Sequence, residues 1–180
     1  MNSTTERRAA KASIEDLFDE HSPRMFRAAY RVTGNMTDAE DVLQTVFVRL
    51  LKRDQVPDLG AGAGSYLHRA AVNAALDLLR KKKRAPQVAI DEEQDDDPGE
   101  GLIDAAAPLA FAERSEIRDM VRHAVGQLNE RAAEIFALRY FEGYGNTEIA
   151  QMVGTSRSAI AVTLHRSREK LKGELGPIFR

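Results

Sequence analysis

Residues 146–165 combine small, apolar and cationic side chains at a spacing suited to binding duplex DNA. Ala150 is small enough for two helices to cross closely, Gly154 supplies a bend between them, and Ile160 holds the second helix against the first. This is the spacing of a helix-turn-helix. The outward face of its second helix is predicted to carry Arg157, Ser158, Ala161, Val162, His165, Arg166, Arg168 and Lys172.

The charged members of this face suit DNA phosphates, and those nearest the helix N-terminus suit a major groove. The alternative to a DNA-binding motif is an ordinary helical hairpin whose arginine-rich end is only solvated.

A second basic segment covers residues 66–84, where one helical face carries Arg69, Asn73, Arg80 and Arg84 and residues 80–84 are all positively charged. A solvated helix end that complements the helix dipole also explains that run.

The residue types needed for catalysis or metal binding are missing or badly spaced. The chain has no cysteine, and its four histidines, His21, His68, His123 and His165, are scattered without metal-ligand spacing. No zinc-protease, serine-hydrolase or nucleotide-binding motif occurs, and the acidic run lacks the pattern of a calcium loop. We therefore predict no catalytic residue, no metal site, no cofactor and no enzymatic activity.

Helical periodicity extends through the rest of the chain and predicts an all-α fold. In the first half, one helix should end at Gly34, a second should start at Thr37 with a capping box to Glu40, and a third should be capped by Ser65. In the second half, a helix around residues 117–128 should precede one capped by Asn129 and then the helix-turn-helix.

Charge divides the chain into blocks although the net charge is only −2. Residues 1–85 carry +4, residues 86–114 carry −8, and residues 115–180 carry +2. Residues 86–107 offer no periodic apolar face and contain an acidic run, which predicts a flexible linker. We therefore expect a disordered tail (1–11), a helical domain (12–85), the linker (86–107) and a helix-turn-helix domain (108–180); an acidic loop within one domain is the alternative.

Four segments, in this order, resemble the extracytoplasmic-function (ECF) sigma factors of the sigma-70 family, which keep only the second and fourth sigma regions. They are residues 38–50, DAEDVLQTVFVRL; residues 66–80, YLHRAAVNAALDLLR; residues 138–143, LRYFEG; and residues 148–171, from EIA to HRSREKL. The resemblance covers nearly the whole chain apart from its N-terminal tail.

The resemblance implies a bacterial transcription initiation factor. Such a factor binds the β and β′ subunits of core RNA polymerase and directs the polymerase to promoter DNA. The helix at 38–53 would then bind the polymerase through Asp41, Gln44, Thr45, Val48, Arg49 and Lys52. The helix at 66–84 would engage unpaired bases of the minus-ten element through Tyr66, His68, Arg69, Asn73, Arg80 and Lys81.

The helix-turn-helix would read the minus-thirty-five element, but it departs from the family pattern. Ala161-Val162-Thr163 stands where a Lys-Ser-Arg run is common, and Val72 stands where an arginine is common. These changes remove cationic contacts, so the sequence does not predict the promoter.

The resemblance also implies an anti-sigma factor as a partner. The absence of cysteine suits a reducing cytoplasm, and no apolar run is long enough to span a membrane, so we expect a cytoplasmic location. Two other readings stay open. A stand-alone helix-turn-helix regulator would bind palindromic DNA without the polymerase. A sigma-like decoy would titrate an anti-sigma factor without touching DNA.

Overall fold

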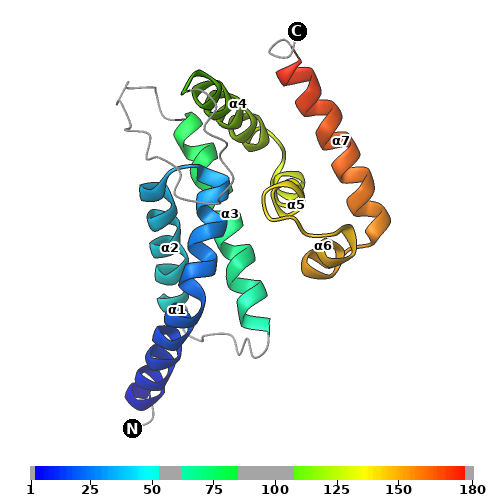
Figure 1. Ribbon diagram of the computed structural model, residues 1–180. Coiled ribbons are helices and arrows are strands. Elements are labelled where there is room, and N and C mark those ends of the chain that lie inside the picture. Colours follow the sequence, from blue (N-terminus) through cyan, green and yellow to red (C-terminus); the bar gives the residue numbers. More distant parts are fainter. Residues whose placement is uncertain (1–2, 53–61, 85–107, 177–180) are drawn as a thin grey trace.

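The computed structural model describes the backbone of residues 3–52, 62–84 and 108–176, and the side chains of residues 14–52, 62–82 and 116–176. This part of the chain is helical and holds no strand, which confirms the predicted all-α fold (Figure 1). The linker predicted at residues 86–107 lies outside the described residues. The helices are α1 (Ser3–Thr33), α2 (Met36–Leu51), α3 (Ala63–Arg84), α4 (Pro108–Gly126), α5 (Glu130–Tyr140), α6 (Asn146–Val153) and α7 (Arg157–Leu175).

Helices α1, α2 and α3 pack together as one bundle. Their apolar stripes meet in a core in which Met25, Val42 and Leu67 are almost fully buried. α1 begins at Ser3, so it includes residues 3–11, which the sequence analysis placed in a disordered tail. Residues 6–11 are Glu, Arg, Ala and Lys, which favour helix, and no glycine or proline separates them from the rest of α1.

Two helix starts in this bundle differ from the prediction. α2 begins at Met36 and is capped by Asn35, whose Oδ1 accepts the N–H of Asp38 at 2.9 Å. The reason lies in Gly34, whose φ of +74° ends α1 and leaves Asn35 in the extended conformation of an N-cap residue. α3 begins at Ala63, so Ser65 lies inside its first turn and is not its cap.

Helices α4 to α7 form a second bundle, in which α7 packs against α4, α5 and α6. As predicted, Asn129 caps α5: its Oδ1 accepts the N–H of Ala132 at 2.8 Å.

The predicted helix-turn-helix is formed by α6 and α7. Gly154 ends α6 with φ +66°, a left-handed conformation that glycine adopts without steric penalty. Ser156 then caps α7 by accepting the N–H of Ala159 at 3.1 Å. Ile149 and Ile160 are fully buried between the two helices, so the turn and the apolar contact together fix their crossing.

The two bundles also touch each other, because α3 packs against α4 and α5 (Figure 1). The sequence predicted two domains on a tether and gave no reason to expect this contact. It places the polar face of α3 against the second bundle.

Truncation of Ile160 to alanine should destabilise the helix-turn-helix bundle by about 2–5 kcal/mol, because it leaves a cavity in a fully buried site. Val162→Ala is the matched control, since Val162 is a β-branched residue of the same helix and is 49% exposed. Urea unfolding followed by circular dichroism measures both. Equal losses in the two variants would contradict the packing described for α7.

Candidate nucleic-acid interface

The second helix of the helix-turn-helix, α7, presents its predicted DNA face to solvent. All eight residues that the sequence assigned to it are exposed. The opposite face is buried through Ile160, Leu164, Ser167 and Leu171. Arg157 stands at the exposed N-terminus of α7, where free backbone N–H groups and the helix dipole favour a phosphate.

The departure from the family pattern falls within this face. Ala161 and Val162 are exposed, and their methyl groups suit contact with thymine methyl groups. Thr163 is half-buried, and its hydroxyl donates to the carbonyl of Ala159 at 2.9 Å. The other departure, Val72, is fully buried in the core, so this position does not face nucleic acid here.

A second exposed face lies on α2. The six residues predicted to bind polymerase are all exposed: Asp41, Gln44, Thr45, Val48, Arg49 and Lys52. Helical periodicity groups Leu51 with the apolar stripe of α2, but Leu51 is 52% exposed and lies one turn from Val48, itself 45% exposed. Neighbouring exposed apolar side chains of this kind mark protein contact surfaces.

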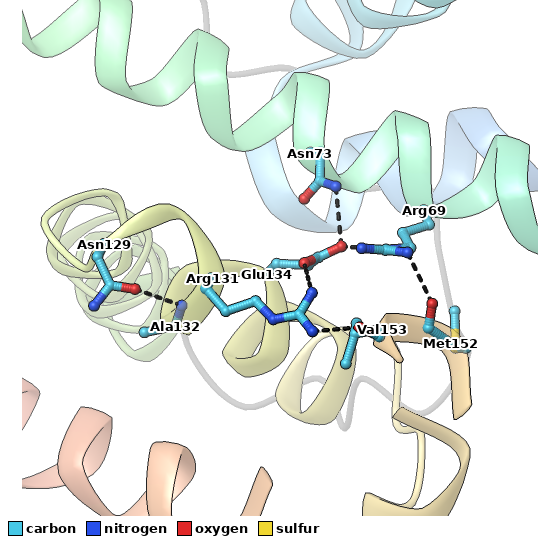
Figure 2. A network of polar contacts seen from close by, with 8 residues as sticks. All are labelled: Arg69, Asn73, Asn129, Arg131, Ala132, Glu134, Met152 and Val153. Atoms are coloured by element: carbon cyan, nitrogen blue, oxygen red, sulfur yellow. Dashed lines mark hydrogen bonds and ion pairs between the residues drawn. The ribbon is translucent and has the colours of Figure 1, made fainter. Parts of the chain in front are cut away.

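Three of the six residues predicted to bind the minus-ten element contact the second bundle: Arg69 and Asn73, which stay partly exposed, and His68, which is buried. The side chain of Glu134, on α5, lies between α3 and Arg131 of its own helix (Figure 2). Its Oε1 accepts hydrogen bonds from Arg69 Nε and, at 3.0 Å, from Asn73 Nδ2. Arg69 Nη1 also donates to the carbonyl of Met152 at 2.8 Å.

The surroundings of Glu134 lower its pKa below the usual value. Burial acts the other way, since it penalises the charged carboxylate, but the hydrogen bonds from Arg69 and Asn73 and the charges of Arg69 and Arg131 outweigh it. Glu134 is therefore ionised at neutral pH although its side chain is only 6% exposed.

His68, the third of these residues, is 2% exposed. Its Nε2 lies 2.8 Å from Glu142 Oε2, and its Nδ1 lies 3.2 Å from the Tyr144 hydroxyl. Two arginines of α1 reach the same pair: Arg31 contacts Glu142 at 3.3 Å, and Arg24 donates to the Tyr144 hydroxyl at 2.6 Å.

The other three minus-ten candidates differ in exposure. Lys81 is exposed and Tyr66 is half-buried. The side chain of Arg80 is 15% exposed and bonds Asp77 at 3.0 Å, so it is directed mainly toward the protein. The structure therefore does not gather all six residues into one open face.

Sequence reasoning missed Glu134, Glu142 and Tyr144. One signal was available for Glu134, which is the one charged residue in the otherwise apolar run of residues 132–138 and would need a partner to remain charged if that run is buried. Nothing in the sequence identified that partner.

The described residues contain neither a cluster of metal ligands nor a membrane-spanning helix. No three potential metal ligands cluster within them. Among the described helices, none combines the length and the apolar character needed to cross a bilayer.

Comparison with known proteins matches both bundles. Residues 17–85 match the family described as Sigma-70 region 2, and residues 118–171 match Sigma-70, region 4. The RNA polymerase sigma factor CarQ of Myxococcus xanthus is 30% identical over 175 residues, which are 96% of this chain and 94% of CarQ.

Two further proteins are similar. The ECF RNA polymerase sigma factor SigE of Mycolicibacterium smegmatis is 30% identical over 167 residues, which are 93% of this chain but only 63% of SigE. The structure of CnrH in complex with the cytosolic domain of CnrY has the same fold, with a TM-score of 0.50, 21% identity, and coverage of 97% of this chain and 95% of that one. This chain therefore belongs to the sigma-70 family of RNA polymerase sigma factors, in its extracytoplasmic-function group.

Proposed function

We propose that this chain binds core RNA polymerase through the exposed face of α2 and directs it to promoters, where α3 engages the minus-ten element and α7 the minus-thirty-five element. One observation carries the proposal: the α2 face and the α7 face are both open to solvent, on separate bundles that match separate sigma regions. A chain with two such faces can hold the polymerase and DNA at once. It acts by binding and catalyses no reaction of its own.

The α2 face suits a protein partner. Val48 and Leu51 supply apolar area, while Gln44, Arg49 and Lys52 supply polar groups around it. Protein interfaces commonly combine an apolar centre with such a polar rim. We assign this face to the core enzyme.

The α7 face suits duplex DNA. It combines cations with two small apolar side chains, Ala161 and Val162, near the N-terminal half of the helix. Helix-turn-helix proteins place that half of the second helix in the major groove. We assign the more C-terminal cations Arg166, Arg168 and Lys172 to phosphates.

We also propose a protein inhibitor as a partner and a cytoplasmic site of action, where polymerase and promoters are found. The resemblance to ECF sigma factors supports an anti-sigma factor. CnrH, which has the same fold, was solved bound to the cytosolic domain of a second protein.

Purified chain mixed with bacterial core RNA polymerase should form a one-to-one complex on gel filtration, and that complex should transcribe from the DNA upstream of the chain's own gene. If no complex forms and the free chain binds palindromic DNA tightly, the stand-alone regulator is correct instead. A complex with an anti-sigma factor but none with polymerase would favour the decoy.

Replacement of Val48 with glutamate should weaken core polymerase binding at least about tenfold, because it places a charge in the apolar centre of the α2 face. Fluorescence anisotropy with labelled chain measures the affinity. Val162→Glu is the matched control: it makes the same change at a similarly exposed valine on α7 and should leave core binding intact. Equal weakening by the two variants would remove the assignment of the α2 face.

Lys172→Ala should weaken promoter binding by the holoenzyme about equally on matched and mismatched minus-thirty-five sequences, because we assign Lys172 to a phosphate. It should also reduce the slope of log affinity against log salt by about 0.9, the effect of one phosphate contact. Lys170→Ala is the control, since the Lys170 ammonium is held by the Gln127 carbonyl at 3.0 Å. An unchanged slope for Lys172→Ala would contradict the assignment.

A further inference from the structure

We propose that Val162 is a specificity-determining residue of α7, which selects thymine in the minus-thirty-five element by apolar contact with the 5-methyl group of that base. Ala161 supplies a second, shorter methyl group beside it. This inference rests on the proposed function, because it names the base that the α7 face recognises.

Val162 lies on the side of α7 that is farthest from the rest of its bundle. Successive residues of an α-helix are about 100° apart, so Val162 is nearly opposite both Ile160 and Leu164 around the helix axis. Those two side chains are 0% and 5% exposed, whereas Val162 is 49% exposed, more than any other large apolar side chain described in α4 to α7. A helix that enters a major groove with this face leading therefore brings Val162 to the base edges.

Charges along α7 indicate which part of the helix DNA approaches. Arg157 and Arg166 are exposed cations on opposite sides of the helix, as are the two sugar-phosphate strands that border a groove, and Val162 lies between them on the exposed face. Glu169 is exposed two turns beyond Val162 on nearly the same line, and its carboxylate repels phosphates. The N-terminal half of α7, which includes Val162, is therefore the part that suits the groove.

The hydroxyl groups nearest Val162 are already hydrogen-bonded within the motif. The Ser158 hydroxyl lies 3.0 Å from the Ser156 hydroxyl, which also accepts the N–H of Ala159 at 3.1 Å. The Thr163 hydroxyl donates to the Ala159 carbonyl at 2.9 Å. These hydroxyl groups stabilise the first turns of α7, so the exposed methyl groups are what this part of the face offers to a base.

An apolar side chain at a base edge favours thymine. In the major groove thymine alone presents a methyl group, whereas cytosine presents an amino donor and the purines present hydrogen-bonding groups only. Valine placed over those polar groups removes their water and supplies no partner, which costs free energy. Valine placed over a methyl group instead buries apolar area, which is favourable. One contact by Val162 therefore discriminates thymine from the other three bases.

Modified bases test the methyl contact directly. Holoenzyme assembled from core polymerase and the whole chain is used to select duplexes from a promoter randomised over its minus-thirty-five element, and it should select thymine at one or more positions. Deoxyuridine at such a position lacks only the methyl group and should weaken binding about fourfold, the effect of one buried methyl group. Cytosine should weaken binding further, and 5-methylcytosine should bind about fourfold better than cytosine. Deoxyuridine between the two promoter elements is the DNA control and should have no effect.

Variants of Val162 test which residue makes the contact. Val162→Ala should reduce the deoxyuridine effect to less than about twofold, because the shorter side chain buries less of the methyl group. Val162→Ile keeps a branched apolar side chain and should retain the effect. Lys170→Ala is the matched control on the same helix, since the Lys170 ammonium is held by the Gln127 carbonyl, and it should also retain the effect. Fluorescence anisotropy with labelled duplexes measures each affinity.

The possible outcomes separate this inference from the proposed function. If no selected thymine depends on its methyl group while the holoenzyme still binds the promoter, the methyl contact is wrong and the proposed function stands. An equal deoxyuridine effect for the native chain and Val162→Ala would assign the contact to another residue and overturn the role of Val162. So would a Val162→Ala variant with reduced transcription at unchanged DNA affinity, because Val162 would then contact protein. Failure of the holoenzyme to bind any promoter would overturn the proposed function, and this inference with it.

Discussion

The arrangement of the two bundles depends on the need of one buried carboxylate for partners. Glu134 is nearly inaccessible to water, and burial alone would penalise its charge. Arg131 supplies one partner from the same helix, and Arg69 and Asn73 supply two more from the other bundle. Since hydrogen bonds are directional, these contacts fix where α3 lies against α5.

The helices themselves were largely predictable, because they rest on local patterns. The cap at Asn129 and the bend at Gly154 follow from residues within one or two turns, and both were found as expected. The start of α2 was not, because Asn35 and Thr37 are both good cap residues. The choice between them depends on the positive φ of Gly34, which the sequence pattern does not show.

The site was less predictable, because its decisive contacts join residues far apart in the chain. Arg69 and Glu134 are separated by 65 positions. Periodicity correctly grouped Arg69 and Asn73 on one polar face of α3, but it contains no information about what covers that face. By contrast, all the assigned residues of α2 and α7 are exposed as predicted, since no other described helix covers those faces.

The distribution of charge gives the near-neutral chain two kinds of basic surface. Cations of α1 and α3 face Glu134 and Glu142 across the contact between the bundles, whereas the cations of α7 face solvent. Added salt weakens an exposed cation's attraction for DNA, and it also weakens the ion pairs that hold the bundles together. These two effects oppose each other on α3, where Arg69 is paired with Glu134, but not on α7, whose cations are exposed. The two basic surfaces therefore differ in what their side chains already contact: the α7 face is open to solvent, whereas Arg69 and Asn73 of α3 are hydrogen-bonded to the second bundle.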